Sequence, residues 1–187
     1  RRTGTDPEDV FMMLVSDRLR IAHTTLHVGV REALGQIDTH RIVRVIKATR
    51  TALHCIGIGT PKIAVSGINP HAGEGGLFGT DDEKIVAPAI AEVQEIGVDA
   101  YGPFGADTMY LDESYDAYVV MFHDQGHIPA KLLGFNGTAT FAIGTPVLFS
   151  SVAHGSALDI AGRGKADPGA LIWAIKQVSG AAVSAED

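Results

Sequence analysis

Three histidines stand where their side chains could bind a metal ion. His27, His71 and His123 each follow a short apolar run that is typical of a strand. Three neutral imidazoles are a common donor set for a divalent ion that keeps positions open for a substrate. The three are far apart in the sequence and share no local ligand motif, so ordinary histidines that hydrogen-bond their neighbours fit equally well. The spacing leaves both interpretations open.

Other side chains that could take part in chemistry lie near His123 in the sequence or in a turn before it. Asp124 and Lys131 are seven residues apart, so on a continuous helix they would lie on one face. A lysine beside a metal ion could transfer a proton, although a solvated surface amine is the commoner fate of lysine. Asp107 could support a metal ligand from behind or stabilise the turn that contains it.

A loop at 154–164 is rich in glycine and contains a carboxylate. Gly155, Gly162 and Gly164 surround Asp159. Glycine backbone can approach a nucleotide closely, and a carboxylate suits the two hydroxyls of an unphosphorylated ribose while repelling a 2'-phosphate. The G-x-G-x-x-G signature is absent, so a structural turn fits as well as a nucleotide site.

These residues need a scaffold, and the apolar periodicity predicts one. Short strand-like runs alternate with longer amphipathic ones, the pattern of a sheet covered by helices. Three loops, 69–76, 123–131 and 154–164, each follow a predicted strand, and the carboxyl ends of strands in an open α/β sheet converge on one crevice. We therefore expect the three loops to lie together. The predicted strands are 10–15, 19–26, 62–65, a short one before Gly102, 117–122, 138–143 and 147–152.

Helices are predicted between the strands from apolar spacing and from capping residues. Three are expected. They are 39–56 with a cap at Asp38 or Thr39, a helix from Asp81 or Asp82 to about 96, and a last helix from about 167 to beyond 175.

The composition limits the class of protein. Of 187 residues, 15 are Lys or Arg and 22 are Asp or Glu, so the formal charge is -7. A nucleic-acid partner is not expected, because phosphate contacts need clustered cations. Cys55 is the only cysteine, so no internal disulfide can form and a reducing compartment fits. No apolar run approaches the roughly 18 to 20 residues that span a bilayer, so we expect a cytoplasmic protein without a membrane partner.

Four segments match a set of motifs in order and spacing. They are NPHAGEGG at 69–76, GPFGADT at 102–108, HDQGHIPAK at 123–131 and HGSALDIAGRGKAD at 154–167. Together they resemble the 4-hydroxythreonine-4-phosphate dehydrogenase family, with the closest likeness to its terephthalate dihydrodiol dehydrogenases. The resemblance implies a three-layer α/β/α fold of the isocitrate and isopropylmalate dehydrogenase-like type. Residues 1–187 would form one α/β unit, the second domain plus C-terminal segment of a two-domain enzyme, without the family's N-terminal region.

The resemblance also implies cofactors and an assembly. A divalent metal ion, with zinc the first candidate, would bind to His27, His71 and His123. NAD is the implied cofactor, and a homodimer is the implied assembly. The adenosine half of NAD would lie against the third loop. The residues implied there are His154, Gly155, Ser156, Ala157, Asp159, Ile160, Gly162, Gly164 and Asp167.

The resemblance implies roles at the substrate site for five residues. Lys131, assisted by Asp124, is expected to take the proton of the reacting hydroxyl, and Asp107 lies at the same active site. Thr140 and Phe149 stand where the vitamin B6 enzyme of the family has a substrate-binding asparagine and arginine. Without the arginine, the site lacks a guanidinium group that could bind a phosphate through two hydrogen bonds. An aromatic ring instead suits a flat apolar substrate.

The resemblance thus implies NAD-dependent, metal-assisted oxidation of a β-hydroxy carboxylate with loss of carbon dioxide. The expected substrate is an aromatic-derived cis-dihydrodiol carboxylate such as terephthalate dihydrodiol. The first alternative is a phosphorylated substrate, either 4-hydroxythreonine 4-phosphate or a related four-carbon acid phosphate. A non-catalytic binding module is the alternative from another class of protein.

Overall fold

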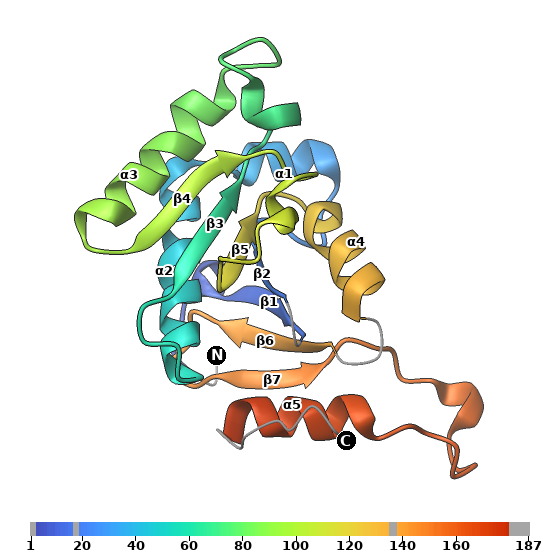
Figure 1. The fold of residues 1–187 in the computed structure, drawn as a ribbon. Helices are drawn as coiled ribbons and strands as arrows, with labels where there is room; N and C mark the ends of the chain where they lie inside the picture. The colour runs from blue at the N-terminus through green and yellow to red at the C-terminus, as the bar shows by residue number, and fades with distance from the viewer. Residues whose placement is uncertain (1–2, 17–18, 135–137, 180–187) are drawn as a thin grey trace.

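The computed structural model describes residues 3–16, 19–134 and 138–179, and in them seven strands form one mixed sheet of order β4-β3-β5-β2-β1-β6-β7 (Figure 1). Every predicted strand is confirmed. The strands are β1 (Phe11–Val15), β2 (Arg20–His23), β3 (Lys62–Ser66), β4 (Asp99–Phe104), β5 (Ala117–Val120), β6 (Ala139–Ile143) and β7 (Phe149–Val152). The helices are α1 (Val30–Gln36), α2 (Thr39–Cys55), α3 (Ala87–Glu95), α4 (His123–Gly134) and α5 (Gly169–Ser179).

The strand directions correct one expectation. β4, β3, β5 and β2 are parallel, so the loops at 69–76 and 123–131 leave the same end of the sheet. β1 is antiparallel to both β2 and β6, and β7 is antiparallel to β6. The connections from β1 to β2 and from β6 to β7 are too short for a crossover, so each pair must reverse direction. The loop at 154–164 therefore leaves the opposite end, and the expectation of three loops at one end is wrong for it.

One face of the sheet is covered by α2 and α3. The side chains of Ile42, Ile46 and Leu53 on α2 are fully buried in the main core. Thr49 is buried among them, and its hydroxyl donates to the Val45 carbonyl at 2.8 Å, which satisfies the polar group without leaving the helix. The predicted cap is confirmed, because the Asp38 carboxylate accepts from the Arg41 amide at 2.6 Å.

The second predicted cap is wrong. A π-helical turn at Asp82–Val86 leads into α3, and neither Asp81 nor Asp82 caps it with its side chain. The Asp82 carboxylate is instead directed to another loop, where it accepts from the Ile68 amide at 2.7 Å.

The other face of the sheet carries α4, which runs across β5, β2 and β1 (Figure 1). Ala130 packs in a second core with residues of the sheet, including Ile21 and Val120. Gly126 makes the close approach possible, since a Cβ at this position would overlap Ile21 and the His23 ring.

Pro129 lies inside α4 and has no amide to donate to the Gln125 carbonyl four residues earlier. The hydroxyl of Tyr110 replaces that donor, at 2.8 Å from the Gln125 oxygen. Burial raises the pKa of Tyr110, so its hydroxyl keeps its proton and remains a donor. Tyr110 thereby satisfies the backbone group that the proline leaves unpaired.

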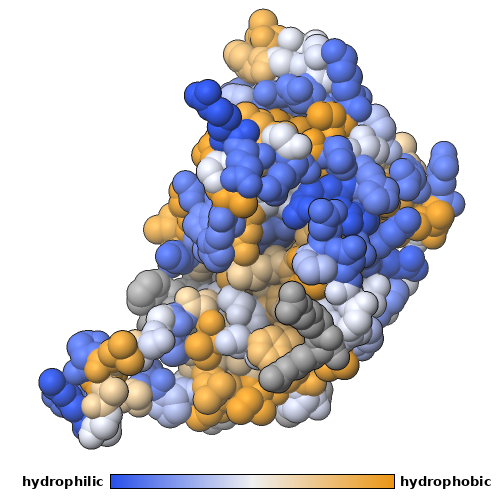
Figure 2. Space-filling view, turned by 180° about the vertical axis from the view of Figure 1, so that it is seen from behind, coloured by the Kyte–Doolittle hydropathy of each residue, from blue (hydrophilic) through white to orange (hydrophobic). Residues whose placement is uncertain are grey.

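α5 packs on β7 and β6 at the edge of the sheet. Figure 2 shows apolar surface along the lower edge of the molecule, where this helix lies. Leu171, Ile172 and Ile175 of α5 are exposed there. Among the described helices, none is both long enough and apolar enough to cross a membrane.

We predict that Tyr110→Phe lowers the free energy of unfolding by about 1–3 kcal/mol, because the buried Gln125 carbonyl loses its donor. The loss should be smaller in a Pro129→Ala background, where the new amide supplies the helical hydrogen bond. Tyr115→Phe is the matched control, since the Tyr115 hydroxyl makes no hydrogen bond to a described residue. Urea unfolding of the single and double variants checks this. Equal losses in both backgrounds would contradict it.

Candidate active site

Two of the three candidate metal ligands come together at the carboxyl ends of adjacent strands. His27 follows β2 and His123 begins α4 directly after β5, and their ring centroids are 5.6 Å apart. Hydrogen bonds join the two strand ends just before these residues. The Thr24 amide donates to the Val120 carbonyl at 2.8 Å, and the Thr25 hydroxyl donates to the Met121 carbonyl at 2.6 Å. The pairing of β2 with β5 therefore positions the histidine pair.

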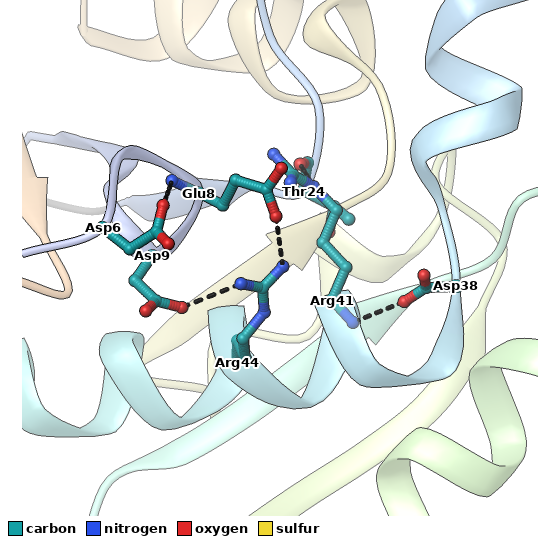
Figure 3. A network of polar contacts seen from close by, with 7 residues as sticks. All are labelled: Asp6, Glu8, Asp9, Thr24, Asp38, Arg41 and Arg44. Carbon is teal, nitrogen blue, oxygen red and sulfur yellow. Dashed lines mark hydrogen bonds and ion pairs between the residues drawn. The ribbon is translucent and has the colours of Figure 1, made fainter.

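The turn that carries His27 is also held from α2. Figure 3 shows Arg41 reaching Thr24, and the Arg41 Nε donates to the Thr24 carbonyl at 2.8 Å. Burial lowers the pKa of this guanidinium from a very high ordinary value. The neighbouring Arg44 pairs with Asp9 at 2.9 Å, which fastens the N-terminal segment to the same helix.

The His123 ring is oriented by its neighbour in sequence. Its Nδ1 lies 2.7 Å from the Asp124 Oδ1, which leaves the Nε2 available as a donor to a metal ion. A carboxylate that accepts from the second nitrogen of a ligating histidine is a common support in metal sites. Asp124 therefore contacts His123 in this structure, and its assistance to Lys131 stays a prediction.

His71 lies in a turn with unusual backbone. His71, Ala72 and Glu74 have φ of 51°, 52° and 45°, and Gly73 between them has 82°. Left-handed conformation is costly for residues with a Cβ, by about 1–3 kcal/mol each, and persists where the surroundings enforce it. Strain of this kind clusters at functional sites, which supports a role for the 69–76 loop.

Asp82 holds the loop in this backbone conformation. Its side chain is 1% exposed and accepts from three donors of the loop. These are the Ile68 amide at 2.7 Å, the Asn69 amide at 3.1 Å and the Asn69 Nδ2 at 3.0 Å. Gly67 is required beside it, because a Cβ there would lie 2.7 Å from the Asp82 Oδ1.

The donor set of His27, His71 and His123 fits a divalent ion by its chemistry. In the described ranges, no group of three or more His, Cys, Asp or Glu side chains is arranged to hold a metal ion. The structure thus brings together the pair His27 and His123, with His71 on the loop after β3. Asp107 lies near that loop, because both Asp107 and His71 border Gly105. A Cβ added to Gly105 would be 2.8 Å from the Asp107 Oδ1 and 3.6 Å from the His71 Cα.

A cavity of about 590 Å³ connects His27 to the other end of the sheet. α4 forms one wall: it starts at His123, and Lys131 lies two turns further along it. The third loop joins the cavity there, although it leaves the opposite end of the strands. The predicted site residues that line the cavity are His27, Lys131, Thr140, His154, Gly155 and Asp167.

Other predicted residues lie outside that lining. Phe149 is 64% exposed on β7 and does not line the cavity. The remaining nucleotide candidates lie further out on the third loop, where a Cβ added at Gly162 or Gly164 would meet no described atom within 4 Å. The exposed candidates of this loop beyond the cavity are Ser156, Ala157, Asp159, Gly162 and Gly164, and Ile160 is half-buried.

Sequence reasoning missed two residues of α4. Gln125 accepts from the Met121 and Phe122 amides at 2.9 and 3.0 Å, and its Nε2 donates to the Gly67 carbonyl at 3.0 Å. A glutamine at the third position of a helix is a known capping signal and could have indicated this role. His127 lines the cavity between His123 and Lys131, and burial lowers its pKa.

We predict that Asp82→Asn lowers the free energy of unfolding by about 1–3 kcal/mol, because an amide cannot accept all three hydrogen bonds. Asp81→Asn is the matched control. Asp81 is exposed, and among the described residues it accepts only from the Asn69 Nδ2, at 3.1 Å. The free energy of unfolding of Asp81→Asn should therefore fall by no more than about 0.5 kcal/mol. Urea unfolding measures both. Similar values for the two variants would contradict the role given to Asp82.

Comparison with known proteins identifies relatives over most of the chain. The 1,2-dihydroxy-3,5-cyclohexadiene-1,4-dicarboxylate dehydrogenase of Comamonas sp is 48% identical over 172 residues, which cover 92% of this chain and 55% of that protein. The D-threonate 4-phosphate dehydrogenase of Pectobacterium atrosepticum is 42% identical over 175 residues, which cover 92% and 54%. The chain spans about half the length of the curated relatives it matches.

A solved structure confirms the α/β fold with its mixed sheet. The 4-hydroxythreonine-4-phosphate dehydrogenase of Klebsiella pneumoniae superposes with a TM-score of 0.84 at 41% identity, over 95% of this chain and 55% of that one. The model of the family described as pyridoxal phosphate biosynthetic protein PdxA matches residues 1–178. The chain therefore belongs to the PdxA family.

Proposed function

We propose that this protein is an NAD-dependent, divalent-metal-assisted dehydrogenase that oxidises a hydroxyl group β to a carboxylate, with decarboxylation. The observation that carries the proposal is the single cavity shared by His27, Lys131 and His154. His27, a lysine and the glycine-rich loop are thereby available to one bound molecule. The relatives described above are dehydrogenases by name, which supports the same reaction class.

The proposed chemistry divides between the two ends of the cavity. A divalent ion held by His27, His71 and His123 would lower the pKa of the substrate hydroxyl. Asp124 holds the His123 ring in the orientation that exposes its Nε2. Lys131 contacts the substrate and takes the hydroxyl proton.

The third loop is proposed to hold the adenosine half of NAD, the hydride acceptor. Its glycine backbone is uncovered, which fits close approach of a nucleotide. Asp167 accepts from the Gly169 amide at 2.8 Å at the start of α5, so it also fixes the loop to that helix. The Asp159 carboxylate would accept hydrogen bonds from the ribose hydroxyls.

For the substrate we propose a cis-dihydrodiol carboxylate derived from an aromatic acid. Among the described residues that line the cavity, Lys131 is the only lysine or arginine, and much of the wall is apolar, including Met12, Leu14 and Val152. Such a wall suits a ring better than a phosphate, which prefers several cations. Phe149 lies outside the lining and is not part of this wall. A phosphorylated four-carbon hydroxy acid is the second candidate, supported by the D-threonate 4-phosphate relative.

We predict that His71→Ala weakens Zn²⁺ binding by more than about 100-fold and that Asp124→Asn weakens it by about 10- to 100-fold, because the latter removes only the support of a ligand. His54→Ala is the control, since His54 is exposed on the last turn of α2. Isothermal titration of the metal-free protein measures the affinities. Unchanged affinity in His71→Ala would exclude His71 as a ligand.

We predict a preference for NAD over NADP, because Asp159 would repel a 2'-phosphate. The ratio of kcat/KM for the two cofactors should be at least about tenfold, and Asp159→Asn should reduce it. Steady-state kinetics with each cofactor checks this. Equal kcat/KM for NAD and NADP in the unmodified protein would contradict the assignment of Asp159.

A further inference from the structure

His127 occupies the middle of the cavity wall and has no role in the function proposed so far. It is four residues after His123 and four before Lys131, so the three lie on one face of α4 at successive turns. Adjacent positions of this kind are about 6 Å apart along the helix axis. His127, His27, Lys131 and Thr140 line the same cavity. A molecule that extends from His27 to Lys131 in this cavity lies against a wall that includes His127.

The ring of His127 is held in place from two sides. It stacks on His123 with centroids 3.7 Å apart and planes 8° from parallel. His23 lies behind it at 4.8 Å, and this ring is buried and neutral, because burial lowers its pKa to about 3. Gly126 permits that arrangement by leaving space for the His23 ring. The position of His127 is therefore fixed before any substrate binds.

The backbone determines which nitrogen of His127 carries the proton. The Nδ1 lies 3.2 Å from the His123 carbonyl oxygen, which can only accept, so the Nδ1 must donate. The Nε2 of a neutral imidazole with a proton on Nδ1 is an acceptor. No described residue hydrogen-bonds to this Nε2. The middle of the cavity wall therefore offers an acceptor, one turn before Lys131.

We propose that His127 is a specificity-determining residue whose Nε2 accepts a hydrogen bond from the second, non-reacting hydroxyl of a vicinal-diol acid. The inference rests on the proposed dehydrogenase function. A hydroxyl at this position donates to the Nε2 without carrying charge. An ammonium group at the same carbon would also donate, but the described lining holds one acidic side chain, Asp167, so burying the ammonium charge costs more than burying a neutral hydroxyl. The site therefore selects a vicinal diol over a vicinal amino alcohol.

The test uses three ligands that differ at one carbon: D-threonate 4-phosphate, its 2-deoxy analogue and the corresponding 2-amino acid, 4-hydroxythreonine 4-phosphate. The full-length protein loaded with Zn²⁺ is compared with His127→Leu, which removes the acceptor, and with His127→Gln, which restores one. Leu132→Ala is the control, because Leu132 is exposed on α4 and does not line the cavity. Equilibrium binding is measured by calorimetry without NAD, and KM and kcat are measured with NAD.

We expect His127→Leu to weaken binding of the diol by about three- to tenfold and to leave the 2-deoxy analogue unchanged, because only the diol loses a hydrogen bond. His127→Gln should recover most of the loss, and KM should change more than kcat. The unmodified protein should bind the 2-amino ligand more weakly than the diol. Equal effects of His127→Leu on the diol and the 2-deoxy analogue would overturn the inference while leaving the dehydrogenase function intact. Failure of the unmodified protein to bind or oxidise these ligands and a cis-dihydrodiol carboxylate would overturn both.

Discussion

The position of α4 on the sheet depends on the side-chain amide of Gln125. Its oxygen accepts from the amides of Met121 and Phe122, and its nitrogen donates to the carbonyl of Gly67. One side chain thus joins the end of β5, the first turn of α4 and the end of β3. Backbone groups in partly buried places need such partners. The side chain thus adds a direct link between the loop of His71 and the helix of His123, beyond the pairing of β3 with β5.

α4 in turn connects the two ends of the mixed sheet, so that the binding groups at both ends belong to one continuous site. The parallel strands deliver His27 and His123 to one end, whereas β7 delivers His154 to the other. The helix runs between the two ends and presents His123, His127 and Lys131 at successive turns. Pro129 would weaken this helix, and the Tyr110 hydroxyl compensates at the carbonyl that the proline leaves unpaired. Binding groups for an extended substrate therefore lie on one rigid element.

Local patterns predicted the elements better than their arrangement. The helix over α2 follows from apolar spacing and the Asp38 cap, and all seven strands follow from short apolar runs. α1 was missed because only Ala33 on it is buried, so it has no apolar face to detect. The direction of β7 depends on pairing with β6 and β1, which local periodicity does not encode. His127 was missed and Asp82 was predicted as a helix cap for the same reason, since their roles arise from contacts with other segments.

The central claim is that the histidine pair, the 69–76 loop and the cavity along α4 form one metal-dependent active site. Anomalous diffraction at the zinc edge, on crystals of the full-length protein grown with Zn²⁺, tests this most directly. The account predicts one strong peak within about 2.0–2.1 Å of ring nitrogens of His27, His71 and His123, at the end of the cavity. A strong peak bound elsewhere, with none at these histidines, would contradict it.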